Sequence, residues 1–147
     1  MNPKDLIGSK KVPLHLLPTG GLIHEARALE NGAKKYGPFN WREEGKKVQA
    51  TIYVAACQRH LMAWLDGEDI AEDSGIHHLG HAKACLGILL DALECDNMMD
   101  DRPTPGPSPR LLAKFDKSRP RGEGAEEGPG VPACSGGLPT ALNTGPK

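Results

Sequence analysis

The sequence predicts an all-α fold: a compact bundle of about three main helices, completed by oligomerisation, with a disordered C-terminal tail. Apolar residues recur at three- and four-residue spacing through most of the first hundred residues, as on one face of a helix. No stretch alternates convincingly with the two-residue period of a strand, so little or no sheet is expected. The composition changes abruptly near Arg102, which separates a predicted domain, 1–101, from a tail, 102–147.

The first helix is expected to follow residues 18–21 and to end near Tyr36. Gly37 and Pro38 cannot continue it, because glycine favours a helix end and proline lacks a backbone N–H. The apolar residues at helical spacing in this segment are Leu22, Ile23, Ala26, Leu29 and Ala33. They predict one buried face.

The second and third helices are expected at about 47–65 and about 73–96. Asp66-Gly67 closes the second helix, and either Asp73 or Ser74 is a good N-cap for the third. The apolar stripe of the second helix comprises Ile52, Ala55, Ala56, Ala63 and Trp64. The buried surface expected for the third comprises Ile76, Leu79, Ala82, Leu86, Leu89, Leu90 and Leu93.

The predicted tail holds most of the prolines and many of the glycines. Such a segment cannot bury enough apolar surface to offset its ordering entropy. Within it, Leu111, Leu112 and Phe115 are expected either to dock on the domain or to form a short helix. Three helices with few aromatic residues make a thin core, because a domain of about a hundred residues is marginal alone. We therefore expect a homo-oligomer, dimer or tetramer, in which facing subunits complete the core.

The composition indicates which binding partners and which cellular location to expect. The net charge of −1 without clustered Lys and Arg argues against nucleic-acid binding. The longest apolar run is too short to cross a bilayer, so no membrane partner is expected. The N-terminus lacks a signal-peptide pattern, and the four cysteines form no CxxC pair. These features predict reduced thiols and a cytoplasmic location.

A first cluster of chemically active residues runs from 59 to 81. Its acidic turn carries Asp66, Glu68, Asp69, Glu72 and Asp73. His78 and His81 share a helical face at i,i+3, and His77 with His81 at i,i+4 is the alternative pair. Carboxylates suit Mg²⁺ or Mn²⁺, and imidazoles shift the preference towards Mn²⁺ or Zn²⁺. An acidic loop before a helix is also an ordinary solvated turn that favourably meets the helix dipole.

A second cluster spans residues 32–42. It combines three aromatic side chains with an amide and with cations: Tyr36, Phe39, Trp41, Asn40, Lys34, Lys35 and Arg42. Two lysines at a helix end can simply complement its dipole. Together, however, aromatic faces that stack, an amide that reads a base edge and cations that hold phosphates indicate a nucleotide ligand.

Several ordered motifs make the sequence similar to a known family. GAKKYGPFNWR, Arg59-His60-Leu61, Gly67-Glu68-Asp69, Asp73-Ser74-Gly75 and His78-Leu79-Gly80-His81-Ala82 resemble the phage-associated dATP/dGTP diphosphohydrolase N-terminal domain family. That family resembles the all-α MazG-like nucleotide pyrophosphohydrolases. The resemblance covers about residues 10–96. It implies cleavage of a purine deoxynucleoside triphosphate, dATP or dGTP, to monophosphate and pyrophosphate with Mg²⁺ or Mn²⁺.

The sequence departs from the pattern at two points. Ala71 stands where another acidic residue is expected in the turn. The ExxE and ExxD helical pairs of the MazG-like enzymes are not evident, and His78-Leu79-Gly80-His81 is a candidate counterpart of the second pair. Both departures bear on the metal and on the mechanism.

The expected roles follow from these motifs. Metal binding is assigned to Glu68, Asp69 and Asp73, with His78 and His81 as further ligands or as a general base. Arg59 and His60 are expected to face the same pocket. Phosphate binding is assigned to Lys34, Lys35 and Arg42, and purine binding to Tyr36, Asn40 and Trp41. The hypothesis requires the acidic turn and the imidazoles to converge opposite the aromatic and cationic loop.

Two other readings stay open. HD-domain phosphohydrolases also act on deoxynucleotides, but they need an adjacent His-Asp pair, and the chain has no such dipeptide. The other is a non-catalytic nucleotide- or metal-binding phage accessory protein, which Ala71 and the missing carboxylate pairs favour. The reaction products distinguish the three readings.

Overall fold

The computed structural model describes residues 2–118 and divides the chain into two units, 1–104 and 105–147. The elements are, in order, α1 (Pro3–Gly8), η1 (Leu14–Leu16), α2 (Thr19–Tyr36), η2 (Asn40–Arg42), β1 (Val48–Gln49), α3 (Ala50–Leu65), β2 (Ile70–Ala71), β3 (Ile76–His77), α4 (His78–Glu94), β4 (Met98–Met99) and α5 (Ser108–Phe115). The described chain is mostly helical, as its periodicity predicts. None of its helices has the length and hydropathy needed to cross a bilayer.

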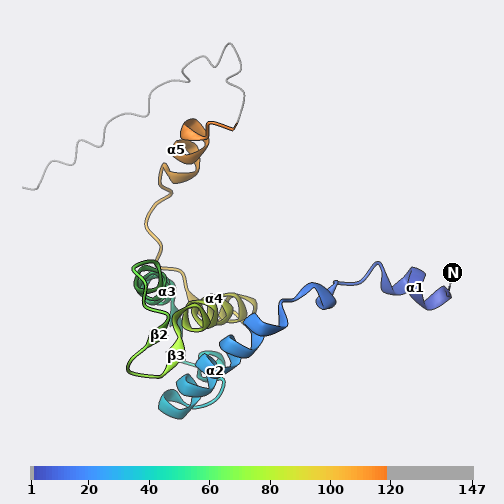
Figure 1. The fold of residues 1–147 in the computed structure, drawn as a ribbon, viewed down its shortest axis with the longest axis horizontal. Helices are drawn as coiled ribbons and strands as arrows, with labels where there is room; N and C mark the ends of the chain where they lie inside the picture. Colours follow the sequence, from blue (N-terminus) through green and yellow to red (C-terminus); the bar gives the residue numbers. More distant parts are fainter. Residues whose placement is uncertain (1, 119–147) are drawn as a thin grey trace, which may run out of the picture. The chain divides into compact units, whose positions relative to one another are not determined.

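Helices α2, α3 and α4 form the body of the first unit, and α4 packs against both of the others (Figure 1). The buried apolar residues among those described are mostly alanines: Ala28, Ala50, Ala71, Ala82, Ala84 and Ala92, with Val48, Cys57 and Ile76. Ala28, Ile76 and Ala84 form one cluster, against which Leu29 packs. Small side chains allow the helices to approach closely, but they bury little apolar area. Many leucines of α4 stay exposed as a result.

The backbones of α2 and α4 approach each other closely at Gly80. A Cβ atom on Gly80 would lie 2.7 Å from the carbonyl oxygen of His24 and 3.0 Å from its carbonyl carbon. Both are backbone atoms of α2, so they have little freedom to move away. Lys83, one turn further along α4, forms an ion pair with Glu25 of α2. Glycine at position 80 is therefore required by the packing of the two helices.

The third predicted helix starts later than expected. Asp73 and Ser74 do not cap it: α4 begins at His78, and the Nδ1 atom of His77 accepts a hydrogen bond from the backbone N–H of Leu79 at 3.1 Å. The preceding residues form a hairpin instead, because β2 pairs antiparallel with β3. Gly75, with φ of 66°, closes this hairpin in the left-handed region that favours glycine.

The second predicted helix is also shorter at its start. Instead of continuing back to Lys47, α3 begins at Ala50, because Val48 pairs with Met98 in the parallel β1–β4 ladder. The carboxylate of Asp101 accepts a hydrogen bond from the backbone N–H of Thr51 at 2.8 Å. A residue fifty positions away thus satisfies a free N–H in the first turn of α3. The expectation of little or no sheet holds, since each strand has two residues.

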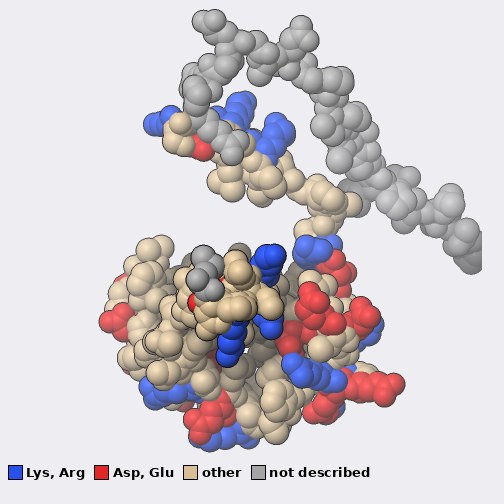
Figure 2. All heavy atoms as spheres, turned by 90° about the vertical axis from the view of Figure 1, so that its right-hand side faces the viewer, with Lys and Arg blue, Asp and Glu red and all other residues tan. Residues whose placement is uncertain are grey.

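In the second unit, residues 108–115 form α5, so this part of the predicted disordered tail is helical. Leu111, Leu112 and Phe115 all lie on it and are exposed. The remaining part of the predicted tail, 119–147, lies outside the described residues. In Figure 2, most Asp and Glu side chains on the visible described face of the first unit lie toward its right-hand side, with Lys and Arg side chains among them.

Candidate functional site

Three histidines from two helices meet between α3 and α4. The Nδ1 atoms of His60 and His78 are 2.8 Å apart, at hydrogen-bond distance. The rings of His60 and His81 are stacked with centroids 4.6 Å apart and planes inclined by 10°. His77, the alternative partner of His81 at i,i+4, contacts His24 instead, at 5.3 Å between ring centroids. The structure therefore brings together His60, His78 and His81 and leaves His77 out.

Burial and neighbouring charges favour the neutral form of two members of this trio, His60 and His81. Burial lowers the pKa of His60, and the neighbouring His81 and His78 lower it further. Burial also lowers the pKa of His81; nearby Asp73 opposes this effect, while His78 and Lys35 add to it. Lys35 and Asp73, two residues of the predicted site, are thus close enough to His81 to act on its charge.

His78 has a ring nitrogen without a hydrogen-bond partner among the described residues. Its side chain is 8% exposed, and its Nε2 atom is fully buried. The Oε1 atom of Glu68 lies 3.2 Å from Nε2, but the contact lacks hydrogen-bond geometry. The backbone N–H of His78 donates to the carbonyl of Asp69 at 2.9 Å, which holds the acidic turn beside the ring. A buried polar atom without a partner is costly, and it marks a place for a ligand.

Ser74 supports the third histidine. Its Oγ atom lies 2.8 Å from the Nε2 atom of His81. The sequence indicated this residue as a helix cap and as part of the motif Asp73-Ser74-Gly75, without a role in the site. Ala71, in the same hairpin, is 3% exposed, and its carbonyl accepts the backbone N–H groups of Ser74 and Gly75. An acidic side chain at position 71 would be buried at a cost in desolvation, so the fold itself explains the alanine.

A cavity of about 350 Å³ lies between α2, α3, α4 and η2. Its polar and aromatic lining comprises Tyr36, Asn40, Trp41, Tyr53, His81 and Cys85. Most of its other walls are apolar, with residues such as Leu29 and Ile88. The three residues predicted to hold a purine and one of the histidines predicted to be catalytic thus line one cavity. Tyr53 and Cys85 were missed by the sequence analysis; burial raises the pKa of each, so both keep their protons at neutral pH.

Other predicted residues have different neighbours. Lys34 forms an exposed i,i+4 ion pair with Glu30 at 2.8 Å. Arg42 forms an ion pair with Asp91 at 2.7 Å. Neither lines the cavity. Arg59 is exposed on α3 next to His60, and its charge lowers the pKa of that histidine.

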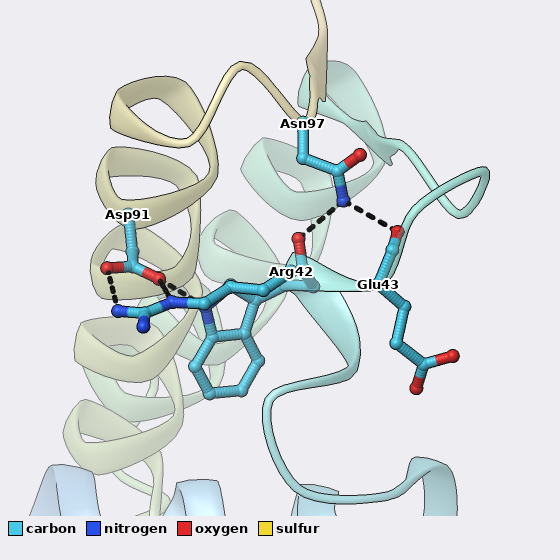
Figure 3. A network of polar contacts seen from close by, with 5 residues as sticks. Arg42, Glu43, Asp91 and Asn97 are labelled. Carbon is cyan, nitrogen blue, oxygen red and sulfur yellow. Dashed lines mark hydrogen bonds and ion pairs between the residues drawn. The ribbon is translucent and has the colours of Figure 1, made fainter.

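The loop that carries Trp41 is held by two residues that sequence reasoning missed, Asp91 of α4 and Asn97 directly after that helix (Figure 3). The carboxylate of Asp91 accepts hydrogen bonds from Trp41 Nε1 at 2.6 Å and from Arg42 Nε and Nη2 at 2.7 Å each. The side-chain amide of Asn97 donates to the carbonyls of Trp41 at 2.7 Å, and of Glu43 and Lys46 at 3.2 Å. Asp91 is the one acid inside the apolar run ILLDAL, and that pattern is the signal for it.

Because of this network, the stability of the protein is expected to depend on the pH in the acidic range. The hydrogen bonds from Arg42 and Trp41 lower the pKa of Asp91 to about 2. A depressed native pKa stabilises the fold above the ordinary aspartate pKa and loses this contribution as the pH falls towards the native value. We expect Asp91→Asn to lower the thermal midpoint at pH 5–7, and the difference from wild type to close between about pH 4 and 2. A difference that is equally large at pH 2 would contradict this origin.

The predicted metal ligands are not assembled into one set. No group of three His, Cys, Asp or Glu side chains within residues 2–118 is arranged to hold a metal ion. Among Glu68, Asp69, Asp73, His78 and His81, the close contact joins Glu68 Oε1 to His78 Nε2 at 3.2 Å. Asp69 and Asp73 are exposed in the hairpin region beside them. Of the predicted metal ligands, Glu68 and His78 are therefore the two whose side chains lie in contact.

Two comparisons with known proteins indicate the same family. A family model described as dATP/dGTP diphosphohydrolase, N-terminal, matches residues 1–102. A curated protein of Salmonella phage PMBT28, described as a dATP/dGTP diphosphohydrolase, is 32% identical over 92 residues. That match covers 63% of this chain but 30% of the phage protein, so it spans less than a third of the relative. No solved structure matches the chain.

Proposed function

The chain belongs to the dATP/dGTP diphosphohydrolase N-terminal family, and we propose that it hydrolyses dATP or dGTP to the monophosphate and pyrophosphate, with Mg²⁺ or Mn²⁺. One observation carries the proposal: the cavity lined by Tyr36, Asn40 and Trp41 is also lined by His81, which belongs to the histidine trio. A site for a base and a site for phosphate chemistry are therefore adjacent.

The cavity suits a purine. Its volume of about 350 Å³ is within the range of small-molecule sites, and its walls are mainly apolar with a few polar groups. The rings of Tyr36 and Trp41 offer faces for stacking. The amide of Asn40 and the protonated hydroxyl of Tyr53 offer hydrogen bonds to the edge of a base. No group in this lining carries a fixed charge, which suits an uncharged base.

The residues around His78 fit a divalent cation. The buried, unpartnered Nε2 atom beside the Glu68 carboxylate provides two donors of the types that Mn²⁺ accepts. Such ions commonly take their other ligands from substrate phosphates and water, so two protein ligands are sufficient. A bound cation supplies neutralisation of the triphosphate charge and activation of water. We assign Glu68 and His78 to this role, with Asp69 and Asp73 on the same hairpin.

The chain's own residues complete the site. His81 lines the cavity, and Ser74 fixes its ring through a contact with Nε2. We assign His81 as the group that accepts the proton of the attacking water. His60, stacked on His81 and hydrogen-bonded to His78, keeps both rings in place. We assign phosphate binding to Lys35, whose charge acts on His81.

Product analysis tests the proposal. The full chain is incubated with dATP, dGTP, dCTP and dTTP in turn, with Mg²⁺ or Mn²⁺, and the products are separated by chromatography. Pyrophosphate with dAMP or dGMP is the expected result. Triphosphate with a nucleoside would indicate the HD-type reaction instead. Tight binding of a purine nucleotide without turnover would indicate an accessory protein.

We also propose that the protein is a homo-oligomer. The cavity is lined by the face of α4 that carries His81, Cys85 and Ile88. At 100° per residue, an exposed leucine row occupies the opposite face of the same helix. Its members are 37%, 50%, 65% and 50% exposed: Leu79, Leu86, Leu90 and Leu93. A helix that is apolar on two opposite faces is usually buried on both of them. A second copy of this chain would cover the exposed leucine face of α4.

The oligomer proposal makes a separate prediction. The double variant Leu86→Glu/Leu90→Glu should be monomeric, because each interface would then bury unpaired carboxylates. Light scattering after size-exclusion chromatography measures the mass of both proteins. Leu16→Glu, at an exposed leucine of η1, is the control and should keep the wild-type mass. A wild type that is monomeric at tens of micromolar contradicts the proposal.

A further inference from the structure

We propose that Asp91 is a positioning residue for the nucleobase: through Trp41 and Arg42 it fixes the loop that forms one wall of the cavity. The inference rests on the proposed function, because it assumes that the cavity binds a purine nucleotide. Asp91 itself does not line the cavity. It acts on the ligand through the indole ring, whose N–H it accepts at 2.6 Å.

The loop between α2 and α3 contains one residue whose conformation its local preference does not explain. Gly37 and Gly45 adopt positive φ, of 90° and 79°, without strain, but Phe39 also has a positive φ, of 57°. A left-handed phenylalanine is uncommon and persists only where the surrounding structure enforces it. The side-chain hydrogen bonds that hold the loop from outside come from α4 and the residues directly after it. Removing them should release the loop and the cavity wall with it.

Asp91 and Asn97 hold the loop in different ways. Asn97 donates to three backbone carbonyls, so it holds the course of the main chain. Asp91 binds two side chains, and one of them, Trp41, lines the cavity. Loss of Asp91 should therefore free the indole ring while the main chain stays anchored. The variant should still fold, with the lower thermal midpoint described above, and its ligand binding should be impaired.

The variant Asp91→Asn removes the charge at nearly constant volume. A carboxylate accepts from the indole and from both guanidinium nitrogens, but an amide offers one acceptor oxygen and two N–H donors. Its NH₂ group would face another donor, Trp41 Nε1 or the Arg42 guanidinium. We expect nucleotide affinity to fall by about tenfold, the scale of one lost charged hydrogen bond. Because the anchor acts on binding, KM should rise by a similar factor while kcat changes little.

Tryptophan fluorescence provides the direct measurement. The chain has two tryptophans, Trp41 and Trp64, so a Trp64→Phe background leaves Trp41 as the reporter. The full chain is titrated with dGMP and with dAMP, and the Kd is taken from the change in Trp41 emission. The same proteins are assayed for KM and kcat with dGTP and dATP. Circular dichroism follows the fold of each protein.

Asp100→Asn is the matched control. The Asp100 carboxylate also takes a bidentate arginine contact, from Arg102, and its pKa is likewise lowered to about 2. This residue does not line the cavity. The inference expects Asp100→Asn to bind both nucleotides as the background does. Equal losses in the two variants would overturn the specific role of Asp91.

A third variant decides the case if Asp91→Asn does not fold. Trp41→Phe, in the Trp64-containing chain, keeps an aromatic ring and removes the N–H that Asp91 accepts. Weaker binding of dGMP by calorimetry in a folded Trp41→Phe protein supports the inference, and unchanged binding overturns it. If the Trp64→Phe background binds and hydrolyses dGTP, and Asp91→Asn does so equally well, this inference alone is overturned. A background protein that binds no purine nucleotide overturns the proposed function as well.

Discussion

Replacing His81 by alanine is expected to lower kcat for the preferred purine triphosphate by about 10²–10⁴-fold, the usual contribution of a positioned general base. His81 is the member of the histidine trio that lines the cavity, and Ser74 holds its ring. Its side chain is partly exposed, so its removal should leave the helices intact. Pyrophosphate release measures the effect, and the far-ultraviolet circular dichroism should match that of the wild type.

The partner variant in the acidic turn is Glu68→Gln, which keeps the size of the side chain but weakens its contact with His78. Glu68 is half exposed, so the fold should tolerate the change, while turnover should be lost at ordinary cation concentrations. Glu72→Gln, at an exposed acid of the same hairpin, is the matched control and should keep wild-type turnover. Retained activity in both the His81→Ala and the Glu68→Gln proteins would remove this assignment of the site.

Replacing Gly80 by alanine is expected to destabilise the protein by about 1–3 kcal/mol, the cost of forcing an extra methyl group into a packed interface. The new Cβ would lie 2.7 Å from the backbone carbonyl oxygen of His24, so α2 and α4 must separate. The intrinsic helix preference of alanine over glycine opposes this loss by about 1 kcal/mol. Urea unfolding followed by circular dichroism measures the net change.

Gly32→Ala is the control for this prediction, because Gly32 lies inside α2 with no atom within 4 Å of the added Cβ. There the helix preference acts alone, so we expect neutral or improved stability, by up to about 1 kcal/mol. Equal effects at the two glycines would show that the close approach of α2 and α4 does not limit the fold.

The helical periodicity of the sequence was sufficient to predict α2, α3 and α4 but not all of their ends. The end of α2 was predicted correctly, because Gly37 stops a helix through its own backbone preference. The start of α4 was not, because Asp73 and Ser74 are good caps locally, yet the pairing of β2 with β3 takes that segment out of the helix. The start of α3 was misplaced for the same reason, since β1 pairs with a strand about fifty residues later.

The candidate site shows a similar division. The sequence marked the histidines and the aromatic loop as unusual, since residue type and helical spacing are local properties. It left open whether His77 or His78 joins His81. It also assigned Arg42 to phosphate, although the guanidinium is held by Asp91. A sequence shows that a cationic side chain is present, but not which anionic group it binds in the folded protein.

The sequence by itself determined the family, the helical class and the residue types that nucleotide chemistry needs, because motifs and periodicity lie within short stretches of chain. Only the tertiary structure decided that His60 joins the trio, that Tyr53 lines the cavity and that Asp91 and Asn97 hold its wall. The contacts of His60, Asp91 and Asn97 join residues 18 or more positions apart. Contacts at such separations depend on how the helices pack, and backbone preferences within one segment carry no information about them.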